Sequence, residues 1–325
     1  MPLNSPDFLA IGLDSITADS VCKFDLYQEM ADSLRLFRRS NVSIAQKDLD
    51  NLKTKGQETL YVPASQKGKL QEFMIRRLPY LLRDESVSVE TKLESLTEIS
   101  VGVLDQVLTD PRSEAAIRGT VDQCRNHVAL AVQGDQTQRV MTSSRPTTTF
   151  PIAHAINVGN LAILLGLRCG IEDGDLLHGL GVGALLHEIG KRIIDPNYYF
   201  RADNKTHVSN SRLKRYPVIG TDMLKSVEVV PRSALFPILE HQERLDGSGF
   251  PHELRASQIS KAGRIVAICD HYDETLHSSD GFMVKPTPFQ VLMKMREDTG
   301  KFDRRILVEF IHLLGSGLAL EKTQV

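Results

Sequence analysis

The second half of the chain, after Phe150, has apolar residues at helical spacing with few interruptions. Short loops rich in polar residues, glycine or proline separate most of these runs, and no alternation of strands and helices appears. The runs predict helices over 152–168, 173–189, 211–226, 232–244, 259–277, 287–298 and 303–314. This half therefore predicts an all-α helical bundle, and the fold class of the chain is mainly α.

Residues 8–83 have a different pattern of apolar and polar residues. Three short runs, KFDLYQ, SLRLFRR and ETLYVP, are enriched in aromatic and aliphatic residues and are typical of β-strands. The segment SIAQKDLDNLKTKG between them predicts a short helix that begins at a serine cap and ends at a glycine. We therefore expect residues 1–85 to form a small α+β N-terminal module.

The stretch from Val87 to Met141 has the pattern of two long helices, the second beginning near Glu114. The segment MTSSRPTTTFP, at 141–151, interrupts this pattern and is the best candidate for a domain boundary. Residues 86–145 are therefore predicted to be a helical connector, and 146–325 a helical domain. Three roles remain open for the connector: carrying a signal, forming a homodimer seam, or packing against the neighbouring domain.

Composition and charge narrow the classes of function. The 325 residues carry a net charge of −2, which provides no basic surface for binding a nucleic-acid polymer. The N-terminus lacks the cationic start of a signal peptide, and the longest apolar stretch, VGNLAILLGLRCGI, is too short for a membrane span. The four cysteines form no C-x-x-C pair, which favours a reduced, cytoplasmic setting.

Four places in the helical half put metal-binding side chains on otherwise apolar faces. His154 lies on an apolar helical stripe, and His187 continues another stripe. Glu188 follows His187 directly, and a glutamate is seldom buried unless it is paired or bound to a metal. His241 ends an apolar helix before a glycine-rich turn, and Asp270 follows a run with the composition of a buried helix.

Each of these residues alone is more typical of a helix core or a helix end than of a metal ligand. Together, imidazoles and carboxylates on four successive inward faces suit Mn, Fe or Zn better than Mg or Ca. Such an ion activates a bound water and neutralises a phosphate oxygen. Lys191, four residues after His187, lies on the same helical side and could hold a phosphate as a point charge.

The order H…HE-x-G-K…H-x-E-R-x-D-G-S-G-F-P…R-I-x-x-x-x-D-x-x-D resembles the HD-GYP domain, a helical branch of the HD metal-dependent phosphohydrolases. The resemblance spans about residues 146–315, and HQERLDGSGFP and GRIVAICDHYDETL are its most specific segments. Members typically hydrolyse the second messenger cyclic di-GMP, so the resemblance implies a bacterial signalling phosphodiesterase. The N-terminal module is also similar to one that often precedes such domains.

The family's functional residues can be carried over position by position. The resemblance implies that the metal ligands are His154, His187, Glu188, His241 and Asp270. It implies catalytic roles for Glu188 and for Lys191, which matches the lysine after the family's His–Asp pair. The residues that it implies for substrate binding are Lys191, Gly249, Phe250, Pro251, Arg264 and Lys285.

Several positions depart from the family's pattern. Glu188 replaces an aspartate that bridges two metals, Tyr216 replaces a metal-binding histidine, and Gln242 replaces the second histidine of a pair. Phe150 lies where some members carry a further carboxylate, and Phe250 lacks the hydroxyl of the signature tyrosine. In addition, the segment SDGFMVK at 279–285 replaces an Arg-Pro-Tyr-Lys-like stretch.

These departures affect the two metal positions unequally. His154, His187, Glu188 and Asp270 could still hold one ion, whereas the second ion keeps His241 and a share of Glu188. Metal affinity with so few ligands is poor. We therefore expect one divalent ion, Mn, Fe or Zn, with two ions or none as the alternatives.

Three functions remain open at this stage. The first is a phosphodiesterase for cyclic di-GMP or a related nucleotide, with its activity reduced or lost. The second is a non-catalytic module that senses a cyclic dinucleotide or binds protein partners in signalling. The third is a mononuclear phosphohydrolase that acts on another phosphate ester.

Overall fold

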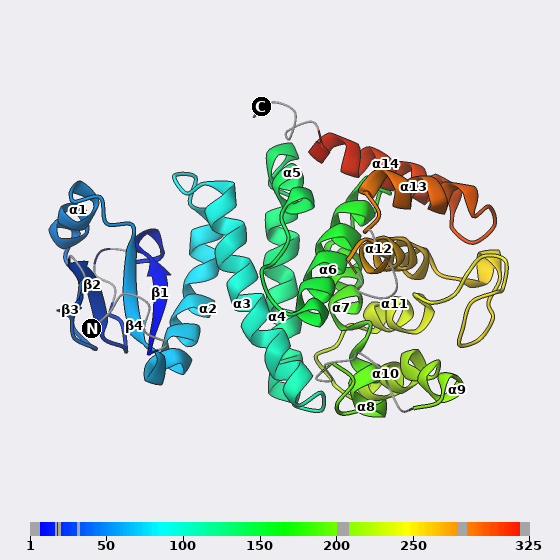
Figure 1. The fold of residues 1–325 in the computed structure, drawn as a ribbon, viewed down its shortest axis with the longest axis horizontal. Helices are drawn as coiled ribbons and strands as arrows, with labels where there is room; N and C mark the ends of the chain where they lie inside the picture. Colours follow the sequence, from blue (N-terminus) through cyan, green and yellow to red (C-terminus); the bar gives the residue numbers. More distant parts are fainter. Residues whose placement is uncertain are drawn as a thin grey trace. The chain divides into compact units, whose positions relative to one another are not determined.

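The computed structural model describes residues 7–16, 18, 21–30, 33–199, 208–277 and 285–318. The chain divides into two compact units, Met1–Ser95 and Leu96–Val325. The division falls inside a long helix, α3 (Val89–Thr109). Figure 1 shows the N-terminal strands in blue and the helices of the second unit from cyan-green to red.

The first unit is built on an antiparallel sheet in the order β1-β4-β2-β3. Its strands are β1 (Phe8–Gly12), β2 (Leu26–Met30), β3 (Ser33–Arg38) and β4 (Thr59–Pro63), and its helices are α1 (Gln46–Thr54) and α2 (Lys67–Arg83), with 3-10 turns η1 (Leu13–Ser15) and η2 (Ala64–Gln66). The three predicted strands and the predicted helix are present. β1 and α2 were not predicted, and α2 contains Pro79 in its interior, which obscures its helical pattern.

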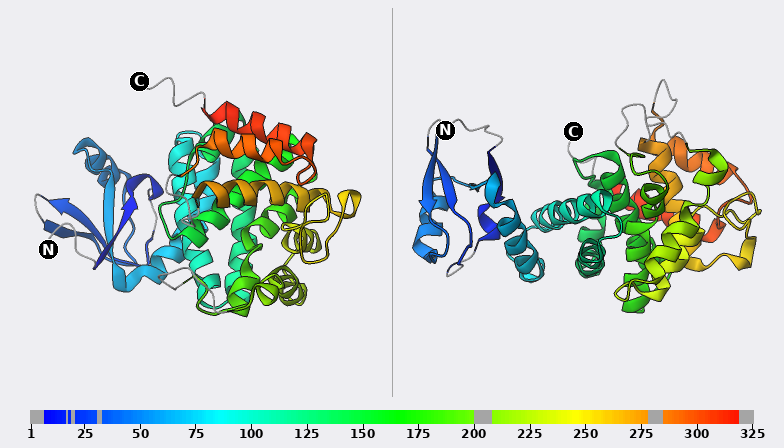
Figure 2. Two further views of the ribbon diagram at one scale, coloured as in Figure 1. Left: turned by 45° about the vertical axis from the view of Figure 1, so that its right-hand side comes forward. Right: turned by 90° about the horizontal axis from the view of Figure 1, so that it is seen from below.

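The second unit is helical and confirms the predicted mainly α fold. Its helices after α3 are α4 (Glu114–Ala131), α5 (Asp135–Ser143), α6 (Phe150–Arg168), α7 (Gly174–Leu186), α8 (Ile189–Ile194), α9 (Asn210–Leu213), α10 (Tyr216–Lys225), α11 (Leu235–Glu240), α12 (Lys261–His277), α13 (Pro288–Glu297) and α14 (Arg304–Leu318), with 3-10 turns η3 (Arg232–Ala234) and η4 (Ala256–Gln258). α6 packs against α7 and α12 and also contacts α4, α5 and α14. Figures 1 and 2 show α6 and α7 in the interior of this unit.

Among the described residues, α6 is also the one helix long and apolar enough to cross a membrane. Its most apolar window has a mean hydropathy of 1.6, and 78% of that window is buried inside the unit. The buried residues include His154, Asn157 and Asn160, whose polar groups have protein partners. Burial among neighbouring helices therefore accounts for the composition of α6.

Three predicted helices are shorter or divided. The segment 173–189 ends as helix at Leu186, and α8 begins after a turn formed by His187 and Glu188. The segment 211–226 becomes α9 and α10, and 232–244 becomes η3 and α11. The break after α7 lets α8 approach α10 so closely that a Cβ at Gly190 would lie 2.0 Å from the Tyr216 carbonyl oxygen. The helix end at His187 is thus set by tertiary packing.

The helical unit also buries a histidine outside the candidate site. His127 in α4 is 1% exposed, with Nδ1 2.7 Å from Asn160 Oδ1 and Nε2 2.8 Å from Ser100 Oγ. Burial lowers the pKa of His127 to about 4, and the hydrogen bond with Asn160 opposes this only in part. The folded protein therefore keeps His127 neutral at pH values where an exposed histidine is charged.

We expect His127 to make the protein less stable in mild acid. Its pKa is about 4 when folded and about 6.5 when unfolded, so the unfolded chain takes up the proton first. The free energy of unfolding should fall between pH 6.5 and pH 4 by about 3 kcal/mol on account of this residue. Denaturant unfolding across this range should give a flatter pH dependence for His127→Gln. The same change at the exposed His312 is the control, and an unchanged slope in His127→Gln would contradict this account.

Candidate metal centre

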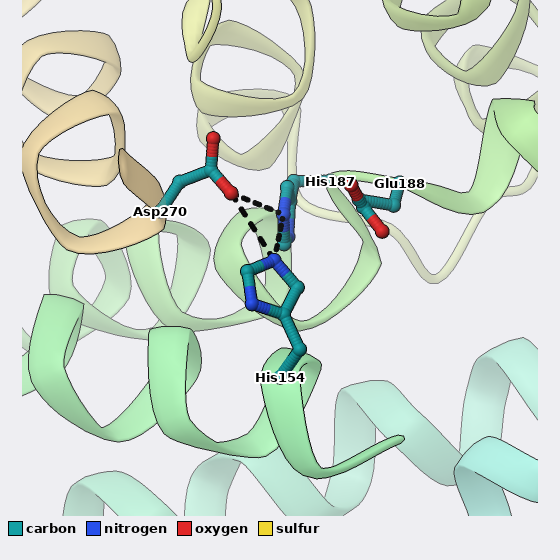
Figure 3. Close-up of side chains that lie close together, drawn as sticks. All are labelled: His154, His187, Glu188 and Asp270. Carbon is teal, nitrogen blue, oxygen red and sulfur yellow. Dashed lines mark hydrogen bonds and ion pairs between the residues drawn. The ribbon is translucent and has the colours of Figure 1, made fainter. Parts of the chain in front are cut away.

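Four potential metal ligands meet where α6, α7 and α12 approach one another. His154 lies near the start of α6, His187 and Glu188 follow the last turn of α7, and Asp270 lies in α12. One ligand atom of each lies within 4.8 Å of the others, in a search of the described part of the chain. Figure 3 shows the side chains of His154, His187 and Asp270 pointing toward one another. The structure thus brings together four of the five metal ligands that the sequence suggests.

Three of the ligand atoms form a nearly equilateral triangle. His154 Nε2 lies 3.2 Å from His187 Nε2 and 3.1 Å from Asp270 Oδ1, and the third side measures 3.3 Å. Atoms about 2.1 Å from one ion are about 3.0 Å apart at octahedral angles and about 3.4 Å apart at tetrahedral angles. The three side chains therefore fit a single divalent metal ion.

The sequence analysis missed the carboxylate that orients His154. Asp273 lies one helical turn after Asp270, and its Oδ2 accepts a hydrogen bond from His154 Nδ1 at 2.8 Å. Its Oδ1 accepts hydrogen bonds from Arg145 Nη1 at 2.8 Å and from Asn157 Nδ2 at 3.0 Å. Asp273 fixes the ring so that Nε2 faces the triangle, as a carboxylate behind a metal-binding histidine does. The D-x-x-D spacing of Asp270 and Asp273 is the sequence feature from which this role could have been predicted.

The other two members of the triangle are also held from behind. His187 Nδ1 donates to the Ala184 carbonyl oxygen at 2.7 Å, which leaves the Nε2 lone pair for the centre. Asp270 Oδ2 accepts a hydrogen bond from Gln242 Nε2 at 2.8 Å, while Oδ1 faces the imidazoles. Gln242, which replaces a histidine of the family pattern, therefore positions a neighbouring ligand.

The centre favours a positive charge between these side chains. Burial opposes the charge of His154, but hydrogen bonds with Asp270 and Asp273 outweigh it and raise the pKa of His154 to about 10. Burial likewise opposes the charge of Asp270, yet its interactions with His154 and His187 hold the pKa of Asp270 well below its usual range. A proton and a metal ion therefore compete for the same ligand atoms.

Glu188 lies beside the triangle and is neutralised by other partners. Its two oxygens bond to Lys191 Nζ and to the Tyr199 hydroxyl, the latter at 2.5 Å. Burial raises the pKa of Glu188, but Lys191 and the nearby histidines lower it to about 2. Lys191 is buried, and its ammonium group also lies 5.0 Å from the centre of the Tyr216 ring. Glu188 and Lys191 thus form a buried ion pair next to the candidate metal site.

His241 does not join the cluster. Its Nε2 is 2.6 Å from the Tyr216 hydroxyl, and its Nδ1 is 2.9 Å from the Ile238 carbonyl oxygen. Because Nδ1 donates to a carbonyl, Nε2 accepts from Tyr216, and this uses the lone pair that a metal would need. Burial in particular lowers the pKa of His241 to about 3, so it stays neutral. Tyr216 therefore occupies the nitrogen through which His241 would bind a metal ion.

The glycine-rich turn after His241 supports the centre through its backbone. A Cβ at Gly249 would lie 2.5 Å from backbone atoms of Gln242, Glu243 and Arg244, so no larger residue fits. The backbone N–H of Phe250 donates to the Gln242 carbonyl oxygen at 3.2 Å. Pro251, the last residue of the Gly-Phe-Pro triplet, is part of the same turn. The turn thus fixes Gln242, the residue that contacts Asp270.

Two other residues assigned to substrate binding lie in different surroundings. Arg264 donates to Asp303 Oδ2 at 3.0 Å and to the carbonyl oxygens of Ile259 and Ala256. These contacts anchor the start of α12. Lys285 is exposed. The rest of the segment that replaces the family's Arg-Pro-Tyr-Lys-like stretch, 279–284, lies outside the described residues.

The space at the centre is small. A cavity of about 30 Å³ borders His154, His187 and Glu188, and its walls include Leu108 and Tyr199. This volume holds about two water molecules, whereas pockets for organic ligands measure roughly 300–1,000 Å³. Water fits in this cavity, which is too small as it stands for a cyclic dinucleotide.

The helical part of the sequence matches a known family, since residues 139–306 match the family described as HD domain. A cyclic di-GMP phosphodiesterase of Pseudomonas aeruginosa is 29% identical over 162 residues, which cover 50% of this chain and 39% of that protein. The cyclic di-GMP phosphodiesterase PdeB of Borreliella burgdorferi is 25% identical over 170 residues, which cover 52% and 44%. The chain thus spans less than half the length of these two curated relatives.

A solved structure shares the fold. It is described as an HDG"Y"P protein from Bdellovibrio bacteriovorus and aligns with a TM-score of 0.65, covering 95% of this chain and 100% of that one. The sequence identity is 18%, so the similarity concerns the fold alone.

We expect Asp273→Asn to weaken metal binding without removing a ligand. The amide keeps the shape of the side chain but loses the charge that orients His154 and makes it more basic. The affinity for Mn²⁺, measured by calorimetric titration of metal-free protein, should fall about 10- to 100-fold. The control is Asp122→Asn at an exposed position of α4. Equal affinities in wild type and Asp273→Asn would contradict this role.

Proposed function

The chain belongs to the HD domain family, and on this premise we propose that it is a signalling protein of the HD-GYP type with a mononuclear metal centre. We further propose that this centre acts slowly on cyclic di-GMP or a related cyclic dinucleotide. The observation that carries the proposal is the triangle of His154 Nε2, His187 Nε2 and Asp270 Oδ1, with sides of 3.1–3.3 Å. The names of the relatives supply the substrate class.

In this proposal His154, His187 and Asp270 hold Mn, Fe or Zn, the ions that a mixture of imidazole and carboxylate suits. The bound ion lowers the pKa of a coordinated water and offsets the charge of a phosphate oxygen. The 30 Å³ cavity leaves room for that water beside Glu188. The oxygens of Glu188 already accept hydrogen bonds from Lys191 and Tyr199, so Glu188 orients the water and is a weak base.

Lys191 supplies positive charge close to the ion. Its ammonium is buried, and burial opposes its charge, but Glu188 raises the pKa of Lys191 well above its usual range. Lys191 therefore stays protonated and is placed to attract a phosphate oxygen. In a binuclear site, a second ion would provide this charge with a geometry fixed by its ligands, so a lysine replaces it only in part. We expect slow turnover for this reason.

A second candidate function is binding without hydrolysis. It is favoured by the hydrogen bond between Tyr216 and His241, which occupies the side of the missing ion, and by the small volume of the cavity. In that case the metal centre stabilises the fold, and the protein responds to a cyclic dinucleotide or to a protein partner. A homodimer through residues 86–145, one of the three roles open for the connector, would belong to the same signalling role.

Turnover of cyclic di-GMP decides between the two functions. Protein purified without oxygen and reconstituted with Mn or Fe should release the linear dinucleotide slowly, and His187→Ala should abolish this because it removes a ligand. A generic phosphate monoester, tested in parallel, would reveal a mononuclear phosphohydrolase of different specificity. Metal-loaded protein that leaves cyclic di-GMP intact would reject the phosphodiesterase and leave the binding function.

The replaced histidines should control how many ions bind. Wild-type protein should hold one ion per chain, measured by elemental analysis after dialysis. The double change Tyr216→His and Gln242→His frees His241 Nε2 and adds two imidazoles, and we expect it to raise the content toward two ions per chain and to increase turnover. The matched control is Tyr216→Phe, which frees His241 but adds no ligand. Two ions in the wild type would contradict the mononuclear proposal.

A further inference from the structure

A second, larger cavity lies on the far side of Asp273 from the metal ligands. Its volume is about 280 Å³, close to the lower end of the range for pockets that bind small organic molecules. It is lined by the end of α5 and the segment that follows it, by parts of α6, α12 and α14, and by the start of α13. None of the four clustered ligand residues lines it, and Asp273 is the wall between the two sites.

The polar wall of this cavity offers hydrogen-bond donors. Asp273 already accepts three hydrogen bonds, from His154, Arg145 and Asn157. Arg145 uses only Nη1 for this contact, its side chain is 28% exposed, and its other guanidinium nitrogens have no partner among the described residues. His277 also faces the cavity, with Nε2 3.7 Å from Asp273 Oδ1, a distance too long for a hydrogen bond. The basic side chains of the lining, Arg145 and His277, suit an anion.

Other parts of the lining are apolar. They include Met141, Leu161 and Leu314, and all three are mostly buried. A ligand that fills the cavity must therefore combine an anionic end, near Arg145 and His277, with an apolar body. A guanidinium binds carboxylates and phosphates through paired hydrogen bonds, so either group can provide the anionic end.

We infer that this cavity, bounded by Arg145, His277 and Leu161, binds a small amphipathic acid, with a carboxylate or a phosphate monoester on an apolar body. The ligand shares the Arg145 guanidinium with Asp273 and so weakens the attraction between Arg145 and that carboxylate. Asp273 in turn holds His154 Nδ1, so occupancy of the cavity is linked to the metal centre. By reciprocity, ligand and metal change each other's affinity by the same factor.

Calorimetry on the full chain tests the site with benzoate and phenyl phosphate as probes, and with benzyl alcohol as a neutral molecule of similar size. In EDTA-treated protein we expect saturable binding of at least one of the two anions and much weaker binding of the alcohol. The stronger anion identifies the preferred head group. Arg145→Gln should weaken anion binding about tenfold or more, because a charge-assisted pair is lost.

Two further variants separate binding in the cavity from general effects. Arg139→Gln changes an exposed arginine of α5, the helix that precedes Arg145, and should leave anion binding unchanged. Ser144→Trp adds bulk at the exposed edge of the cavity and should reduce binding of both anions. Absence of saturable binding for both anions, or equal affinity in wild type and Arg145→Gln, would overturn the site.

Repeating the titration with Mn²⁺-loaded protein tests the link. We expect the anion affinity to change several-fold on metal loading, and the Mn²⁺ affinity to change by the same factor at saturating anion. Direct binding of phenyl phosphate to the metal is distinguishable from binding in the cavity. It would be unchanged by Arg145→Gln and would be lost when EDTA removes the metal. Anion binding that depends on Arg145 but is identical with and without metal would overturn the coupling through Asp273.

Discussion

The helical unit depends on how it accommodates the charge of Asp270. This carboxylate is 1% exposed and lies in a helix whose neighbouring residues are almost all buried. A buried carboxylate without partners is strongly destabilising. Here His154 and His187 face one oxygen and Gln242 the other, which requires three helices and the turn after α11 to meet at one point. The packing of α6, α7 and α12 and the chemistry of the site are therefore a single arrangement.

The sequence predicts the members of this arrangement better than their partners. His154, His187 and Asp270 stand out because each places a polar group on an apolar helical face, and periodicity alone reveals that. Of the two partners of Glu188, one is predictable from sequence, because Lys191 is only three residues away. The other, Tyr199, is not, because it follows an irregular segment after α8. The pairing of Tyr216 with His241 could not be predicted, because 25 residues separate them and only the packing of α10 on α11 brings them together.

Family motifs proved ambiguous in a different way. Gly249 and Arg264 belong to the segments that carry the resemblance most specifically, and both have packing roles in the structure. Gly249 allows the turn to lie against the backbone of residues 242–244, and Arg264 ties the start of α12 to Asp303. A sequence motif combines two kinds of residue: those that touch a substrate, and those that hold the substrate-binding residues in place. Only the contacts of each side chain separate these two groups.

The replacements around the second ion also form a consistent set. A site that lost an ion but kept all of its carboxylates would bury uncompensated negative charge. Of the altered positions in this chain, Tyr216, Gln242 and Phe250 are neutral, and so is Phe150, which stacks on His154 with ring centres 5.4 Å apart. The remaining carboxylate, Glu188, is neutralised by Lys191. Under the mononuclear proposal, hydrogen bonds and one ion pair satisfy the polar groups around the second position, and no ion is needed there to balance a buried charge.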